Sequence, residues 1–295
     1  MDSKFHPAMK AIKVGDLEGF KELLKQDPSL ATTRSLKSHP TLLQCVALDG
    51  HKVSNNAEMA QVLIDAGADV DGPLVACASI GNAEVAEALL EAGAGIDGDG
   101  AWSPLEEALY WGNEEFVKML LERGASVRNL RAAAGLGRMD LLPSFFNNDG
   151  SLKAEAGKIS WPFGDPEKSN LKSEVKEKLQ AAISGWSHRP QDIINNAFIY
   201  ACMNNHIDAA KFLLQKGADT NAIPPGFDYA GTGLHYAALR GQQAMAEFLL
   251  EQGADPLIKD TKVGSVPSGW ADYGGHPELR DYLRQRESTT SSSNE

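Results

Sequence analysis

The stretch TGLHYAALRGQQAMAEFLLEQGAD runs from Thr232 to Asp255 and contains two short apolar segments, each followed by a glycine. The second segment carries apolar residues at helical spacing: Met245, Ala246, Leu249 and Leu250. This spacing predicts one apolar face of an amphipathic helix. Gly241 favours a tight turn between two helices, and Gly253 favours a left-handed C-cap. We therefore predict a helix–turn–helix unit that cannot bury its apolar face alone.

The same unit recurs along the chain. The two punctuating residues lie 12 positions apart in four copies, at Gly81 and Gly93, Gly112 and Gly124, Asn205 and Gly217, and Gly241 and Gly253. The spacing widens to 13 positions after Gly137 and to 17 after Gly50, and weaker copies begin at Gly15 and Gly275. Stacked units would bury each apolar face against the next, which predicts an elongated repeat array.

The unit resembles the ankyrin repeat. The family pattern T-P-L-H-x-A-A-x-x-G-H…LLxxGAD is matched best by TGLHYAALRGQQAMAEFLLEQGAD, and then by SPLEEALYWGNEEFVKMLLERGAS. The phrase NAIPPGFDYAGTGLHYAAL is also similar to an uncharacterised bacterial group of ankyrin-repeat proteins. The resemblance implies an all-α solenoid of about seven or eight repeats, with helix pairs joined by hairpin-like loops. Only one copy keeps the Leu-His pair, and several copies lack the expected hairpin glycine.

The predicted array is interrupted once. We expect an N-terminal repeat array at residues 8–157 and a C-terminal array at residues 191–286, followed by a disordered Ser-rich tail at 287–295. Residues 158–190 contain the turn-rich stretch WPFGDPEK and then apolar residues every fourth position. This insertion is either a degenerate repeat that keeps one helix, a lid over the concave face, or a break between two arrays.

Composition limits the chemical class of the partner. The chain has 28 basic and 40 acidic residues, for a net charge of −12, which argues against a nucleic-acid or anionic-membrane partner. No segment is apolar for long enough to span a bilayer, and the first residues lack a secretory signal. The three separated cysteines, Cys45, Cys77 and Cys202, suggest reduced, buried thiols in a cytoplasmic protein.

No catalytic, cofactor or metal-binding motif is present in the sequence. It contains no Gly-rich phosphate loop, no HExxH and no GxSxG. We expect His235 to hydrogen-bond neighbouring backbone within the stack, and the Asn of the NAE and NEE motifs to cap the second helices. The sequence thus predicts no enzyme, no cofactor and no metal.

The resemblance implies a partner-binding surface. In ankyrin arrays the first helices and hairpin tips line a concave face, and the residues before each central glycine point there. The candidates carried over are Asp99, Trp102, Tyr110, Trp111, Asp228, Tyr229, Leu239 and Arg240. Exposed aromatic residues and arginine are common anchors of protein interfaces, and the aspartates would favour a neutral or basic partner. Alternatively, the aromatic rings pack within the stack or under the insertion.

We therefore expect a monomeric, non-enzymatic module that binds another protein through its concave face. Two alternatives remain open. One is a small-molecule or enzymatic site where the 158–190 insertion covers the groove. The other is an inhibitor that neutralises an enzyme or toxin encoded by a neighbouring gene.

Overall fold

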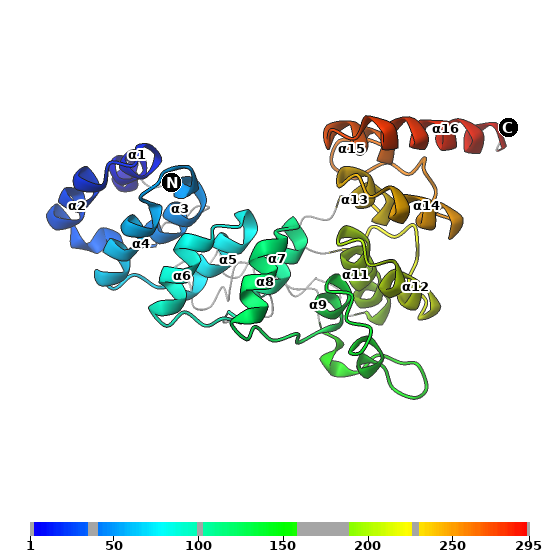
Figure 1. Cartoon of the computed structure of the whole chain (residues 1–295), viewed down its shortest axis with the longest axis horizontal. Coiled ribbons are helices and arrows are strands. Elements are labelled where there is room, and N and C mark those ends of the chain that lie inside the picture. Colours follow the sequence, from blue (N-terminus) through cyan, green and yellow to red (C-terminus); the bar gives the residue numbers. More distant parts are fainter. Residues whose placement is uncertain (1–2, 35–40, 99–102, 158–188, 226–229, 294–295) are drawn as a thin grey trace. The chain divides into compact units, whose positions relative to one another are not determined.

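The computed structural model describes residues 3–34, 41–98, 103–157, 189–225 and 230–293. In these residues first and second helices alternate along the chain (Figure 1). The first helices are α1 (His6–Val14), α3 (Leu42–Asp49), α5 (Asp71–Ile80), α7 (Pro104–Trp111), α9 (Leu130–Gly135), α11 (Pro190–Met203), α13 (Gly233–Leu239) and α15 (Pro267–Tyr273). The second helices are α2 (Leu17–Gln26), α4 (Asn56–Asp65), α6 (Ala83–Glu91), α8 (Glu114–Glu122), α12 (Ile207–Gln215), α14 (Gln243–Glu251) and α16 (Pro277–Ser293). No strand occurs in the described residues, and the predicted all-α repeat fold is confirmed.

The repeats fall into two compact blocks. The N-terminal block contains the described residues up to Ser126, and the C-terminal block contains residues 127–157 and those from 189 onward. Within the N-terminal block, α1, α3, α5 and α7 pack against one another in sequence, and so do α2, α4 and α6. Within the C-terminal block, the same packing joins α9, α11, α13 and α15.

Local sequence sets where several first helices begin. Thr41 and Ser103 form capping boxes with Gln44 and Glu106, in which each side chain bonds the backbone of the other residue. A capping box satisfies two of the backbone donors that a helix N-terminus leaves without partners. At α13 the box pairs Thr232 with His235, so a histidine takes the place of the usual Glu or Gln.

Apart from the turn after α3, where Gly50 has φ −81°, the turns between first and second helices use left-handed backbone. Gly81, Gly112 and Gly241 have φ between 65° and 76°, as the spacing predicted. Asn205 takes the same role with φ 60°, and is the one non-glycine residue with positive φ in the described chain. Gly137 has a second reason to be glycine, because a Cβ there would lie 2.5 Å from Nδ1 of His206 in the next repeat.

Amide side chains at these turns tie each repeat to the one before it. An Asn or Gln amide nitrogen donates to a backbone carbonyl at the end of the preceding first helix. The bonds are Asn55 to Gly15 at 2.8 Å, Asn82 to Ala47 at 3.0 Å, Asn113 to Ala78 at 2.7 Å, and Gln242 to Met203 at 2.7 Å. Because helices end with carbonyls that lack intrahelical partners, these bonds satisfy groups that packing would otherwise leave unpaired.

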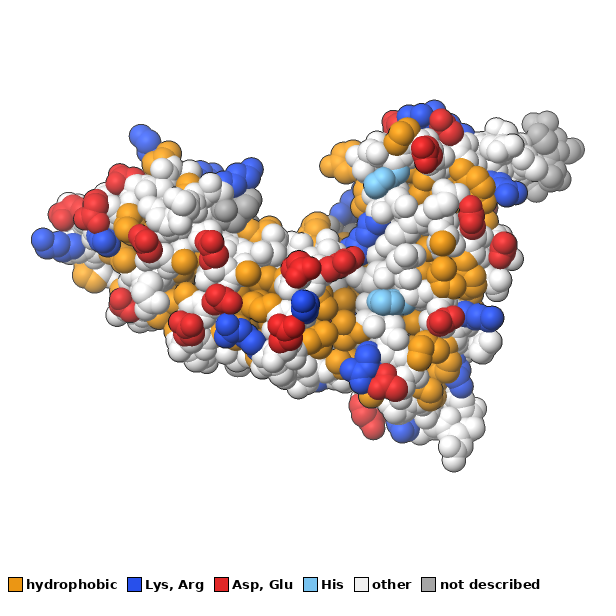
Figure 2. All heavy atoms as spheres, in the orientation of Figure 1, with side chains coloured by type: hydrophobic (Ala, Val, Ile, Leu, Met, Phe, Trp, Pro, Cys, Tyr) orange, Lys and Arg blue, Asp and Glu red, His pale blue; other side chains and the backbone are white. Residues whose placement is uncertain are grey.

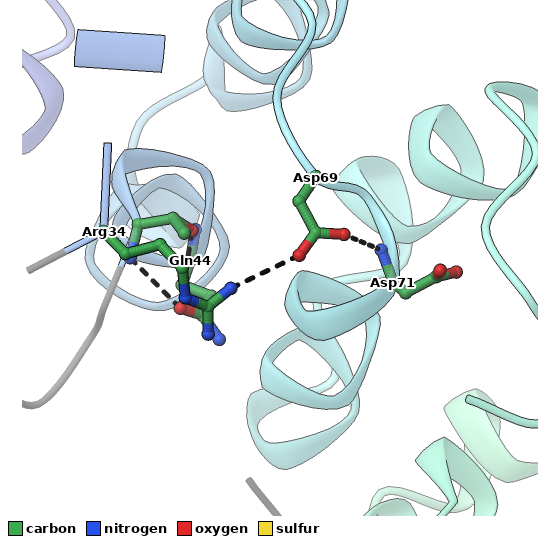
Figure 3. A network of polar contacts seen from close by, with 5 residues as sticks. Arg34, Gln44, Asp69 and Asp71 are labelled. Carbon is green, nitrogen blue, oxygen red and sulfur yellow. Dashed lines mark hydrogen bonds and ion pairs between the residues drawn. The ribbon is translucent and has the colours of Figure 1, made fainter. Parts of the chain in front are cut away.

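A second set of polar contacts lies between the loops at the other end of the helices. Arg34 reaches Asp69 of the next repeat at 3.3 Å, and the second oxygen of Asp69 accepts from the backbone N–H of Asp71 (Figure 3). Asp71 continues the series, because its carboxylate accepts the N–H of Gly95 at 2.8 Å. The loops are therefore linked from repeat to repeat by an ion pair and by a side chain to backbone bond.

The structure differs from the predicted pattern after Gly137. In place of a second helix, the chain forms a short 3-10 turn at Leu142–Phe145 and a hairpin closed by an antiparallel bridge between Phe146 and Leu152. Pro143 lacks the amide donor that a continuing helix needs. The hairpin packs on α12, where the Phe146 and Phe212 rings meet edge to face at 5.8 Å.

The end of the chain also differs from the sequence-based prediction. α16 continues through Glu287 to Ser293, where we expected a disordered tail. Hydroxyls of Ser288, Thr289 and Thr290 bond the carbonyls four residues earlier. These hydroxyls thus find their acceptors within the helix itself.

Candidate functional site

The structure describes four of the eight residues predicted to bind a partner. These are Tyr110, Trp111, Leu239 and Arg240. Asp99, Trp102, Asp228 and Tyr229 lie outside the described residues. The four described residues fall in two separate blocks, so each pair is considered within its own block.

Trp111 is the clearest candidate contact. It is the last residue of α7, and 49% of its surface is exposed. A half-exposed indole loses less conformational entropy on binding than a long flexible side chain, and Trp is enriched at the centres of interfaces. The exposed half of the ring is therefore apolar surface that a partner could bury.

Two neighbours hold the Trp111 ring in place. Its indole N–H donates to Glu107 at 2.8 Å, one helical turn earlier in α7. Tyr110, which is buried, meets the ring edge to face with centroids 5.2 Å apart. Tyr110 therefore positions Trp111 and is itself not an exposed contact. A ring fixed before binding reduces the ordering cost of forming a complex.

Trp111 belongs to a row that runs through the N-terminal block. The last residues of the four stacked helices α1, α3, α5 and α7 are Val14, Asp49, Ile80 and Trp111. Val14 is 68% exposed and Ile80 is 37% exposed, although both are apolar. We call these four residues the terminal row. Val14 was missing from the sequence-based candidates, but its place directly before Gly15 matches that of Trp111 before Gly112 and could have indicated it.

In the C-terminal block the equivalent side chains are used differently. Leu239 is half-buried, and Arg240 donates from Nη1 to the carbonyl of Met203 at 2.5 Å. Gln242 donates to the same carbonyl. Arg240 thus takes part in holding two repeats together. Tyr273, at the end of α15, is 89% exposed.

His235 has the structural role that the sequence predicted. It is fully buried, Nδ1 accepts the backbone N–H of Thr232 at 3.1 Å, and Nε2 lies 3.2 Å from the carbonyl of Ser265. Burial lowers the pKa of His235, although the Ser265 carbonyl and the negative charge of Asp260 oppose this shift. The ring is therefore a buried cross-link and is not placed for acid–base chemistry.

The loop that faces His235 is organised by Asp260. Its carboxylate accepts the backbone N–H groups of Lys262, Val263 and Ser265 and the indole N–H of Trp270. Burial alone would raise the pKa of Asp260, but these donors outweigh it and lower the pKa well below its usual range. The carboxylate is thus a fixed structural acceptor.

The cysteines are likewise poorly suited to act as nucleophiles. Cys45, Cys77 and Cys202 are free and buried in α3, α5 and α11. Burial raises the pKa of the Cys45 thiol to about 12, and it raises the pKa of Cys77 and Cys202 as well. A thiol that stays protonated is a poor nucleophile. Among the described residues, no group of three or more His, Cys, Asp or Glu is arranged to hold a metal ion.

These features define an α-helical repeat solenoid. A family model of ankyrin repeats in three copies matches residues 51–130 and 173–260, more than half of the chain. The chain belongs to the ankyrin-repeat family. Within the described residues, no helix is both long enough and apolar enough to cross a bilayer.

Similar stretches occur in much longer proteins. The chain is 48% identical over 61 residues to XBAT35 of Arabidopsis thaliana, provisionally named an E3 ubiquitin-protein ligase. It is 36% identical over 86 residues to palmitoyltransferase ZDHHC13 of Homo sapiens, and 46% identical over 78 residues to the ankyrin repeat and LEM domain-containing protein 1 homolog of Caenorhabditis elegans. The matches cover 20%, 29% and 26% of this chain, and 13%, 13% and 10% of the relatives. The shared segment is therefore a small part of each relative.

Proposed function

We propose that this chain is a non-enzymatic module that binds another protein through the face formed by its first helices. The observation that supports this most directly is Trp111, half-exposed and held in position by Glu107 and Tyr110. Its neighbours in the terminal row, Val14 and Ile80, add exposed apolar surface on the same stacked helices. Exposed apolar residues in register along a solenoid are typical of a contact surface.

We further propose that the module acts as a monomer in the cytoplasm. Three free, buried cysteines in one chain fit a reducing compartment. The enzyme names of some relatives do not argue for catalysis, since the similarity covers 13% of XBAT35 and 13% of ZDHHC13.

Affinity capture from the native host tests the proposal. The bait is the full chain as wild type, as Trp111→Ala, and as Leu121→Ala. Leu121 is the matched control because it is also a partly exposed apolar residue, at 36%, but lies on the second helix α8. We expect Trp111→Ala to weaken binding of the captured protein by about 2 kcal/mol, as is common for a central aromatic contact.

The purified partner is then titrated against all three baits by calorimetry. The thermal midpoints of the three baits are compared first, so that a loss of binding is not confused with unfolding. A partner that binds wild type and Trp111→Ala equally would contradict the proposal. So would turnover of a substrate by the purified chain.

A further inference from the structure

Charge is distributed very unevenly in the N-terminal block. The 65 residues from Val53 to Val117 contain 13 acidic residues and no lysine or arginine. Before Val53 there are eight basic and six acidic residues, and after Val117 there are 20 basic and 21 acidic residues. The net negative charge of the chain therefore comes from the stretch that begins just before α4 and ends in the first turn of α8. Figure 2 shows acidic side chains on the N-terminal block, where Figure 1 draws α4, α6 and α8 in the same orientation.

Three of these carboxylates lie just across the glycine turn from the terminal row. Glu58, Glu84 and Glu115 occur within the first three residues of α4, α6 and α8, and all are exposed. In the sequence, Ile80 and Glu84 are four residues apart, and so are Trp111 and Glu115. We call these three glutamates the acidic row. In the α5–α6 and α7–α8 repeats the turn edge of the block thus presents an exposed apolar residue close in sequence to an exposed carboxylate.

The carboxylates of the acidic row are available to a partner. In the described part of the chain, none of the three forms a hydrogen bond or an ion pair. Acids at helix N-termini interact favourably with the helix dipole, which gives them a structural role as well. The dipole does not explain Val14, Ile80 and Trp111, because exposed apolar residues gain nothing from it.

We propose that this turn edge binds a polypeptide segment that has an apolar residue at every third position and basic residues between. The proposal rests on the proposed function and specifies the partner's chemistry. Apolar side chains of the segment would cover Ile80 and Trp111, and its lysine or arginine residues would face Glu84 and Glu115. Burial of the apolar contacts supplies affinity, and the uncompensated negative charge speeds the approach of a basic partner.

Repeat spacing indicates how such a segment would be built. Neighbouring helices pack about 8–10 Å apart, and a chain in the polyproline II conformation advances about 3.1 Å per residue with three residues per turn. Three residues of such a segment therefore span one repeat and return the side chain to the same side. An apolar residue at every third position, with basic residues between, would match the row in register.

A synthetic peptide of four Leu-Lys-Lys triplets is the probe, and its binding to the full chain is measured by fluorescence anisotropy. Two matched peptides separate the contributions: four Ser-Lys-Lys triplets keep the charge, and four Leu-Glu-Glu triplets reverse it. We expect the Leu-Lys-Lys peptide to bind at least tenfold more tightly than either. We also expect its affinity to fall between 0.05 and 0.5 M salt, where the charge attraction is screened.

Two pairs of protein variants locate the site. Ile80→Ser with Trp111→Ser should weaken the probe about tenfold or more, whereas Leu121→Ser should leave it within about twofold. The triple variant Glu58→Gln, Glu84→Gln and Glu115→Gln should weaken the probe about tenfold. Its control removes the same charge from the last residues of the same helices, as Asp65→Asn, Glu91→Gln and Glu122→Gln, and should change the affinity less than threefold.

If the two triple variants weakened the affinity for the peptide equally, the proposal would be overturned, because the affinity would then depend on net charge alone. The proposal would also be overturned if the variant Ile80→Ser with Trp111→Ser weakened the Ser-Lys-Lys and Leu-Lys-Lys peptides to the same extent. If sedimentation shows that the free chain dimerises through Trp111, the occupant is a second copy and the proposal fails. A captured partner that needs Trp111 but ignores the acidic row would leave the proposed function standing while removing this inference.

Discussion

His235 is fully buried and uses both ring nitrogens, one toward Thr232 and one toward Ser265. Nδ1 can accept the Thr232 N–H only while it carries no proton, so the buried ring must stay neutral. Burial is the main cause that lowers the pKa of this histidine in the fold. Protonation must therefore work against the folded state.

The free energy of unfolding should therefore decrease as the pH falls. Below the ordinary pKa of 6.5, the unfolded chain binds a proton at His235 that the folded chain does not. Stability is fully present above this pH and is lost as the pH falls toward the lowered pKa, by up to about 2 kcal/mol between pH 7 and pH 5. His235→Gln keeps a side chain suited to the capping box and should remove this part of the loss.

Urea unfolding followed by far-UV circular dichroism at pH 7, 6 and 5 measures the effect. His6→Gln is the control, because His6 is exposed at the start of α1. A pH dependence that is the same in wild type and His235→Gln would show that another group is responsible.

At the same scale, position in the repeat predicted that Trp111 is exposed, but it did not predict that Tyr110 is buried. Both precede Gly112, but α7 turns Tyr110 into the stack and leaves Trp111 half-exposed. Residue type alone does not distinguish them, since both are large and aromatic. The bond from Trp111 to Glu107 depends on how the helix end is packed, which no sequence pattern of this chain indicates.

Second helices show what the asparagines at their start contribute. The sequence predicted caps, and Asn82 does accept the N–H of Val85 at 3.3 Å. Its amide nitrogen also donates to the Ala47 carbonyl of the preceding repeat at 3.0 Å. Asn113 makes the equivalent backward bond and no side-chain cap. The bond between repeats is thus the more general role.

Asn82→Asp separates the two roles. Aspartate is as good a cap as asparagine and favours the helix dipole, but it has no donor for the Ala47 carbonyl. We expect Asn82→Asp and Asn82→Ala to lower the free energy of unfolding by similar amounts, about 1–2 kcal/mol, in urea titrations.

The mirror substitution is the control. Asp16 caps α2 by accepting the N–H of Gly19 at 2.9 Å. Asp16→Asn keeps that acceptor and should change stability by less than about 0.5 kcal/mol. A neutral Asn82→Asp would show instead that capping is the main contribution of Asn82.

Element positions were largely predictable where the glycine spacing held. The 12-residue interval from Gly81 to Gly93 brackets α6, and that from Gly241 to Gly253 brackets α14. The interval after Gly137 is only one residue longer, yet it holds a 3-10 turn and a hairpin. There Pro143 and the turn sequence around Gly150 override an apolar pattern that otherwise suits a helix.

At the scale of the whole molecule, the acidic stretch from Val53 to Val117 repels itself. Like charges crowded on a folded surface oppose compaction, and salt screens this repulsion. Asp65, Glu91 and Glu122 add a second cost, because each ends a helix where the dipole is negative.

Neutralising these three residues should therefore stabilise the chain. We expect Asp65→Asn, Glu91→Gln and Glu122→Gln together to raise the thermal midpoint by a few degrees at 0.05 M salt, from about 0.3–1 kcal/mol at each helix end. The gain should shrink at 0.5 M salt. Thermal scans of wild type and variant at both salt concentrations measure it, and a lower midpoint in the variant would contradict the repulsion.

The amide bonds from Asn82 to Ala47 and from Asn113 to Ala78 join residues that are in each case 35 positions apart. Donor and acceptor occupy the same places in these two copies, so excising or duplicating a complete segment there at the gene level would let new neighbours recreate the same bond. Such a chain can change its length in whole modules at little energetic cost, whereas an insertion of a few residues within a module would break the match. This gives a physical route by which genetic recombination could lengthen or shorten the protein without redesigning it.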